Sequence, residues 1–241
     1  MTKKNITLHP NINEIERFLY MKPKKMHKEG SVTLVTCFVF ILLVAVVLYA
    51  YRAPHWLWIL LMVPLGIIFL VIVNFFRYPE RHYKGDKIHD VIAPSDGTIV
   101  CIEEVYEPDY FKDRRIMIST FMSVTNVHAQ WAPLAGQVLV SEHEDGNFKK
   151  AYLPKASNET ERSTIVIKSD AGPTIMMRQV AGAVARRIVT YYEAGERCEV
   201  DGELGFIKFG SRIDVYLPLD AKILVKLKQT VRGNTTALAH I

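Results

Sequence analysis

Two uncharged stretches decide how this chain is organised: VTLVTCFVFILLVAVVLYAY, residues 32–51, and WLWILLMVPLGIIFLVIVNFF, residues 56–76. Each has about 20 residues, and at roughly 1.5 Å of rise per residue a helix of that length matches a hydrocarbon core about 30 Å thick. Thirteen residues of the first stretch are Leu, Ile, Val or Phe, so its insertion is favoured by about 4 to 8 kcal/mol. We therefore predict a transmembrane helical hairpin over residues 32–76.

These stretches have two other interpretations. A cleaved signal peptide fits poorly, because no small-residue cleavage site follows the first stretch and the second comes after only Arg52–His55. A buried hairpin in a soluble domain remains as the alternative, although two uncharged runs of this length are unusual in soluble cores.

Basic residues flank the predicted hairpin on its outer sides, whereas the short connection has Arg52 alone. By the positive-inside rule, both termini and the domain after the hairpin lie in the cytoplasm, at the cell membrane. The basic leader, residues 1–31, is either a solvated tail or a contact for anionic lipids. The flanking residues are Lys3, Lys4, Arg17, Lys22, Lys24, Lys25 and Lys28 before the hairpin, and Arg77, Arg81, Lys84 and Lys87 after it.

The overall composition excludes several classes of protein. With 49% hydrophobic and 23% charged residues in 241, the chain is not disordered. The net charge of +5 comes largely from the leader, so no nucleic-acid partner is predicted. Cys37, Cys101 and Cys198 show no CxxC spacing, and we expect reduced thiols.

The rest of the chain, residues 77–241, has the pattern of a β domain, with short β-branched runs between turns such as Asp201-Gly202. Only Val180–Glu193 is expected to form a helix. We predict a mainly β, antiparallel sandwich or partly closed barrel. The expected strands are Gly97–Glu103, Arg115–Phe121, Gly136–Ser141, Ser163–Lys168, Thr174–Gln179, Gly205–Phe209, Ile213–Leu217 and Lys222–Lys226.

Common catalytic motifs are missing from this domain. It has no P-loop, no Rossmann glycine pattern, no GxSxG and no HExxH. From Ile88 onward the histidines are His89, His128, His143 and His240, which are too scattered for a metal site, and none is predicted.

The most unusual local pattern is an interrupted strand, Gly205–Val215, which reads GFIKFGSRIDV. Glycine inside a strand usually marks a bulge or a close backbone approach. The other interpretation is that the Gly210–Ser211 bond itself reacts, because a residue without Cβ lets the serine hydroxyl approach the preceding carbonyl carbon. Local sequence alone leaves both interpretations open.

Together with other segments, this stretch resembles the processing site of the phosphatidylserine decarboxylase proenzyme family, in its short, membrane-anchored form that includes archaetidylserine decarboxylase-like members. The resemblance implies a pyruvoyl-dependent enzyme that converts phosphatidylserine to phosphatidylethanolamine. The other matching segments are Phe75–Arg81 (FFRYPER), Ala93–Gly97 (APSDG), Asn126–His128 leading to Ala132-Pro133, Asn158-Glu159 with Arg162, and Ala181-Gly182 with Ala185–Ile188.

The resemblance also implies how the cofactor arises. Ser211 Oγ would attack the carbonyl of Gly210, elimination from the resulting ester would leave dehydroalanine, and hydrolysis with loss of ammonia would leave a pyruvoyl group at position 211. The two chains, 1–210 and 211–241, would remain associated. A pyruvoyl ketone takes up the electron pair left by decarboxylation, so no free cofactor is required. The number of copies in the assembly is left open, and a homo-oligomer is one option.

Site residues follow from the same resemblance. His128 is expected to act as general acid and base, with Asp96 orienting its imidazole in the manner of a triad. Asp96 could equally be an ordinary Asp-Gly turn residue, and a lone histidine is often structural. Candidate cations for the lipid phosphate are Arg178, Arg186, Arg187 and Arg212.

A second function from a different class also fits parts of the pattern. Ala93–Ile99 suits the Pro-x-Asp-Gly turns of biotinyl-lipoyl domains, so a non-catalytic membrane adaptor with such a β-sandwich is the alternative. That interpretation gives the Gly210–Ser211 pair no task and lacks the coiled-coil heptads often found in adaptors.

Overall fold

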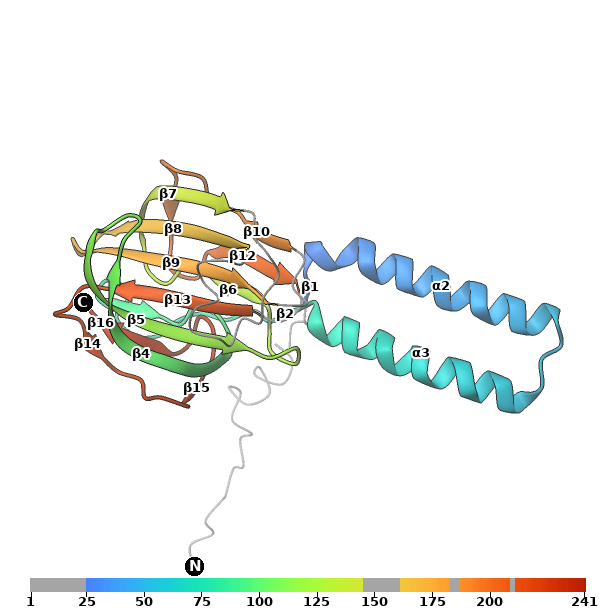
Figure 1. Cartoon of the computed structure of the whole chain (residues 1–241). Helices are drawn as coiled ribbons and strands as arrows, with labels where there is room; N and C mark the ends of the chain where they lie inside the picture. Colours follow the sequence, from blue (N-terminus) through green and yellow to red (C-terminus); the bar gives the residue numbers. More distant parts are fainter. Residues whose placement is uncertain (1–24, 145–160, 183–186, 209–210) are drawn as a thin grey trace, which may run out of the picture.

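A computed structural model describes residues 25–144, 161–182, 187–208 and 211–241 of the chain. Two apolar helices extend side by side from one end of a domain made of β-strands (Figure 1). The predicted fold class is confirmed, since the domain is mostly antiparallel β and its largest sheet curls into a half-barrel.

The helices are α2, Ser31–Ala50, and α3, His55–Phe75, and their ends lie one residue from the predicted ones. Both are long and apolar enough to cross a membrane. Leu48 in α2 and Phe75 in α3 are their only buried residues. Apolar side chains on exposed helices would be unfavourable in water. The hairpin is therefore compatible with association of the chain with a membrane.

The largest sheet is antiparallel and has eight strands in the order β11-β7-β8-β9-β13-β5-β4-β15. Aliphatic side chains alternate along these strands and fill the core on one face, among them Ile118, Ile165 and Ile213. The strands are β4 (Gly97–Glu107), β5 (Asp113–Met122), β7 (Gly136–Glu144), β8 (Arg162–Ser169), β9 (Thr174–Ala181), β11 (Arg197–Cys198), β13 (Ser211–Leu217) and β15 (Thr230–Val231).

Three small sheets complete the domain. One has the order β10-β12-β6, another β14-β16-β3, and β1 pairs with β2. Their strands are β1 (Lys25–Met26), β2 (Arg77–Tyr78), β3 (Asp90–Ile92), β6 (Ala129–Trp131), β10 (Arg187–Thr190), β12 (Glu203–Lys208), β14 (Lys222–Ile223) and β16 (Ala237–His240).

Three neighbouring strands of the large sheet continue into the small sheet β10-β12-β6. Strand β5 leads to β6, β9 leads to β10, and β12 leads to β13, so the order β9-β13-β5 is repeated as β10-β12-β6. The chain thus turns a corner between two sheets at three adjacent places. Corners of this kind need bends or bulges in the strands, and residues 209–210, which join β12 to β13, lie outside the described residues.

The helix expected at Val180–Glu193 was a wrong prediction. Strand β9 runs to Ala181, which is opposite Ser211, and β10 places Ile188 opposite Ile207. Residues 183–186 between them lie outside the described part. Alanine-rich sequence favours a helix locally, but pairing on both sides of the corner overrides this weak preference. Of the predicted strand Lys222–Lys226, only Lys222–Ile223 is strand.

Candidate active site

Ser211 is the first residue of β13, at the corner between the two sheets. It lies between Met122 of β5 and Ala181 of β9 and is completely buried. Its hydroxyl donates to the thioether sulfur of Met122, at 3.1 Å. A thioether is a weak acceptor and no base, so Ser211 is held in place here without being deprotonated. Gly210, the other half of the predicted cleavage site, lies outside the described residues.

His128 lies on the neighbouring connection, between β5 and β6. Residues 123–126 form a turn in which the Asn126 side chain accepts the backbone N–H of Ser123, at 2.8 Å. Nδ1 of His128 lies 3.0 Å from the carbonyl oxygen of Asn126. Because a carbonyl only accepts, the proton of the neutral ring is on Nδ1 and Nε2 has a free lone pair. In the described part of the chain, that Nε2 is buried without a hydrogen-bond partner.

The surroundings of His128 keep the imidazole uncharged. Burial is the main cause that lowers its pKa to about 4, and the positive charge of Arg77 adds to it, whereas the Asn126 carbonyl and the charge of Asp96 act in the opposite direction. At neutral pH the ring is therefore a neutral base. It has the protonation state needed to accept a proton from a hydroxyl.

Aromatic residues at the end of α3 bury this histidine. The Phe75 ring lies 4.1 Å from the imidazole and the Phe206 ring 6.4 Å, between centroids. Phe75 and Phe76 form one buried cluster with Val127, Ala129, Trp131 and Phe206 of the small sheet. The end of the apolar stretch thus attaches the helical hairpin directly to the connection where His128 lies.

Asp96 lies in the bend before β4, and its carboxylate is already engaged. Both terminal nitrogens of Arg81 bind it, and the backbone N–H of Gly233 donates to Oδ1 at 2.9 Å. Its predicted hydrogen bond to His128 is not among the contacts of the described residues. Asp96 acts on His128 only through its charge in this arrangement.

The structure disfavours two of the predicted phosphate ligands. Arg212 is adjacent to Ser211, so its side chain lies on the opposite face of the sheet, where it forms a buried ion pair with Asp214. Arg178 is also buried, and Nη2 lies 3.2 Å from Glu107 and 2.8 Å from Asp109. Carboxylates thus already neutralise both cations.

The other two candidates cannot be compared in this way. Arg187 is in β10, opposite Lys208, and Arg186 lies outside the described residues. The Arg187 side chain is also outside the described part, so both remain predictions.

A further basic residue near the histidine, Arg77, was not among the predicted site residues. Arg77 follows α3, and its guanidinium donates to the carbonyl oxygens of Asn74 at 2.6 Å and Thr125 at 2.9 Å. It thereby connects the end of α3 to the turn that carries His128. Arg81, which binds Asp96, was likewise not among the predicted site residues. Both belong to the segment FFRYPER, whose position directly after an apolar stretch was the available signal.

Several buried polar atoms near the corner have no partner among the described residues. They include Nε2 of His128, Nε2 of Gln130 and Oγ1 of Thr120. Gln130 also accepts from Nε2 of Gln179, whose Oε1 accepts from the Thr190 hydroxyl at 2.9 Å. Unpaired buried polar atoms are costly, and their concentration beside a buried serine and a neutral imidazole is typical of a site built for a ligand.

These features define an enzyme site in a domain attached to an apolar helical hairpin. Comparison with known proteins supports that class and specifies it. A profile of the family named phosphatidylserine decarboxylase matches residues 68–239. Proteins named phosphatidylserine decarboxylase proenzyme from Bacteroides thetaiotaomicron and Bacteroides fragilis are 48% and 49% identical to the chain over 228 residues, which cover 93% of the chain and 99% of each relative.

A protein of the same name from Porphyromonas gingivalis is 46% identical over 219 residues, which cover 90% of the chain and 99% of the relative. The chain belongs to the phosphatidylserine decarboxylase family. It is a decarboxylase, that is a carboxy-lyase, of the self-processing proenzyme type, and the resemblance seen in its sequence is confirmed.

Proposed function

We propose that this chain decarboxylates phosphatidylserine to phosphatidylethanolamine, using a pyruvoyl group that forms when it cleaves itself between Gly210 and Ser211. Two side chains on adjacent connections between the sheets carry the proposal: Ser211 is buried at the start of β13, and the neutral His128, between β5 and β6, has no hydrogen-bond partner for Nε2 among the described residues. The relatives' name supplies the substrate. The adaptor alternative is not favoured, because the family is one of enzymes.

Self-cleavage uses these two side chains in sequence. Nε2 of His128 takes the hydroxyl proton of Ser211, Oγ bonds to the carbonyl carbon of Gly210, and the bond from that carbon to the Ser211 nitrogen breaks as the nitrogen is protonated. Loss of the Ser211 α-proton and of the Cβ–Oγ bond then releases the Gly210 carboxylate. Addition of water and departure of ammonia leave a ketone at position 211.

The residues present fit a small, uncharged group at position 211. Ser211 is wholly buried, and its contact is the Met122 thioether, which needs no charged partner. The pyruvoyl ketone supplies the electron sink for the pair left when CO₂ departs. His128, a neutral base at neutral pH, is suited to hold and then return the proton that replaces CO₂ on the substrate carbon. The apolar cluster around Phe75 excludes bulk water from that proton.

Residues 211–241 are proposed to stay bound after cleavage. Strand β13 is inserted between β5 and β9, opposite seven residues of the first and six of the second. Strands β15 and β16 pair with β4 and β3. Cleavage at the start of β13 and loss of the Ser211 nitrogen leave the pairings of Arg212–Leu217 in place, so the large and small chains remain one folded unit.

The helical hairpin is proposed to span the cell membrane, with both termini and the β domain on the cytoplasmic side, as the distribution of basic residues predicts. A lipid with two acyl chains hardly leaves the bilayer, because each buried CH₂ contributes about 0.8 kcal/mol. An enzyme for this substrate must work at the membrane surface. The contact of Phe75, the last residue of α3, with His128 supports this part of the proposal.

Mass spectrometry of the purified chain tests the cleavage. We expect a fragment of residues 211–241 that begins with a pyruvoyl group, together with conversion of phosphatidylserine to phosphatidylethanolamine. Ser211→Ala should remain one inactive chain. Ser119→Ala, which removes another buried serine hydroxyl of the same sheet, should be cleaved like the wild type. An uncleaved wild-type chain that still released CO₂ would overturn the proposal.

A further inference from the structure

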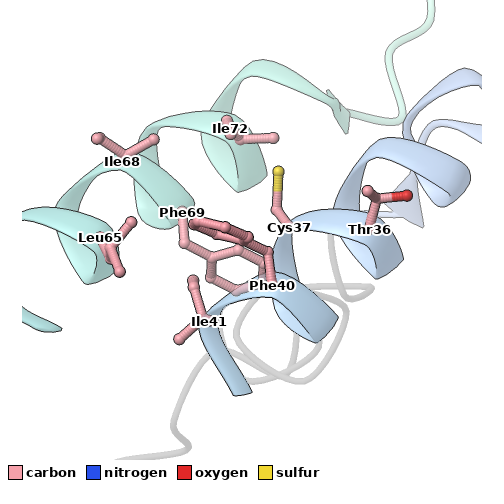
Figure 2. Close-up of a pocket in the computed structure, with 8 residues that line it drawn as sticks. All are labelled: Thr36, Cys37, Phe40, Ile41, Leu65, Ile68, Phe69 and Ile72. Atoms are coloured by element: carbon pink, nitrogen blue, oxygen red, sulfur yellow. The ribbon is translucent and has the colours of Figure 1, made fainter. Parts of the chain in front are cut away.

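An apolar cavity lies between α2 and α3. Its volume is about 320 Å³, and side chains from both helices line it (Figure 2). Apart from the Thr36 hydroxyl and the Cys37 thiol, the side chains around it are hydrocarbon, and its exposed lining is apolar. Water would find few hydrogen-bond partners there, whereas a hydrocarbon chain needs none. The lining residues are Thr36, Cys37, Phe40, Ile41, Leu65, Ile68, Phe69 and Ile72.

The cavity lies next to the aromatic cluster that buries His128. Ile72 lines it and also packs against the cluster of Phe75, Phe76 and Trp131. Three residues, or about 5 Å along a helix, separate Ile72 from Phe75, whose ring contacts His128. A molecule with its tail in the cavity and its head beyond the end of α3 would therefore lie beside the proposed base.

Arg77 lies just beyond the end of α3 and has binding capacity left. A guanidinium has five N–H donors, and among the described residues Arg77 donates to two backbone carbonyls, of Asn74 and Thr125. Within the described ranges no carboxylate forms an ion pair with it, in contrast to Arg81, which Asp96 neutralises. Its charge is felt at His128. It is therefore a cation at the boundary between the helices and the site that forms no direct ion pair with a described carboxylate.

We propose that one substrate molecule occupies both places: its phosphate binds Arg77 and one of its acyl chains lies in the cavity between α2 and α3. An anion attached to a hydrocarbon chain fits a cation and an apolar cavity about one helical turn apart, and the occupant we propose is the glycerophospholipid substrate, which has both parts. The serine head, linked to the phosphate, then lies at the His128 and Ser211 corner. This inference rests on the proposed function and names the residues that select a lipid.

Two pairs of variants test the inference. Leu65→Trp fills the cavity. Leu65→Phe fills it less and is used if Leu65→Trp does not fold. The control is Leu70→Trp, which adds the same ring to an exposed position of α3 outside the cavity. Arg77→Gln removes the charge, and Arg114→Gln removes an exposed arginine that pairs with Glu104 instead. Self-cleavage of each variant is followed on denaturing gels, so that only processed enzyme is compared.

For the cavity, the readout is kcat/KM for dioleoyl over dihexanoyl phosphatidylserine in detergent micelles. We expect the Leu65 variants to lower this ratio about tenfold and Leu70→Trp to leave it at the wild-type value. Equal ratios in all variants would overturn the acyl-chain site.

For the phosphate, the readout is competitive inhibition by dihexanoyl phosphatidylethanolamine against dihexanoylglycerol, which lacks phosphate. Arg77→Gln should weaken inhibition by dihexanoyl phosphatidylethanolamine at least tenfold more than inhibition by dihexanoylglycerol, as loss of a charge-assisted hydrogen bond does. A ratio within twofold of the wild-type and Arg114→Gln values would overturn the role of Arg77. If the wild type neither cleaves itself nor converts phosphatidylserine, the proposed function fails; if it does both and the ratios are unchanged, only this inference fails.

Discussion

The ring of Phe75, the last residue of α3, lies against the imidazole ring of His128, with 4.1 Å between their centroids. One of these residues ends an apolar helix and the other lies in a turn of the β domain, more than fifty residues later in the chain. The contact is buried on both sides. The helical hairpin and the candidate base are thus parts of one packed unit, and changes at the helix end should be felt in proton transfer.

Phe75→Ala should make self-cleavage slower and more sensitive to acid. Removing a buried ring costs about 3 to 5 kcal/mol of stability, and water that enters the space would let the pKa of His128 rise toward its ordinary value. The acid side of the profile of cleavage rate against pH should then move to higher pH. Phe111→Ala, which alters a separate cluster on the other face of the large sheet, should lower stability without moving that profile.

His128 should make the folded protein sensitive to mild acid. Its pKa is lowered to about 4 by burial, whereas in the unfolded chain it is about 6.5. Between these values the unfolded state binds a proton that the folded state does not. The folded state therefore keeps its full stability with respect to this group above pH 6.5 and loses part of it as the pH falls toward 4. His128→Gln should show a smaller decrease in Tm between pH 7 and pH 4.5. An identical decrease in both proteins would contradict the buried neutral imidazole.

The ion pair of Arg81 and Asp96 should stabilise the join between the two proposed chains. Gly233, which belongs to residues 211–241, donates to Asp96 and accepts from Arg81 at 3.0 Å. Asp96→Asn leaves a largely buried arginine without its anion, and we expect a loss of about 2 to 4 kcal/mol in urea unfolding. Asp113→Asn, which breaks the more exposed pair with Arg115, should cost less than about 1 kcal/mol.

The small chain should be released only when the domain unfolds. Because β13 is paired on both edges, residues 211–241 should co-purify with residues 1–210 in native buffer and separate on a denaturing gel. In a urea titration, release measured by size-exclusion chromatography should share its midpoint with the loss of β-sheet circular dichroism. Release at much lower urea would show that β13 is not the central strand of the processed enzyme.

Arg178 should be important for stability and not for lipid binding. With Glu107 it forms an ion pair that is almost completely buried, and Arg178→Gln leaves that carboxylate without its cation, at a cost of about 3 to 5 kcal/mol. Enzyme that still folds should keep the wild-type KM for phosphatidylserine. A KM raised tenfold at unchanged kcat would restore Arg178 as a phosphate ligand.

Much of the architecture could be predicted from local sequence. An uncharged run of about 20 residues has few ways to satisfy its backbone other than a helix, so α2 and α3 were located to within one residue. Alternating β-branched residues between turn residues predicted β4, β5, β7, β8 and β9. The short strands β3 and β6 were missed because three residues carry too little pattern to be recognised without their partners, and β10 was predicted as part of a helix.

Of the candidate site, the sequence by itself pointed to Ser211, His128 and Asp96, because each lies in a segment with its own recognisable residues. Only the tertiary structure decided which groups meet. It put Phe75 and Arg77 beside His128, gave Asp96 to Arg81, and turned Arg178 and Arg212 to the far face of the sheet. The physical reason is that covalent neighbours determine local conformation and side-chain alternation, whereas burial, ion pairing and the pKa of an imidazole depend on residues that come together only when distant strands pair.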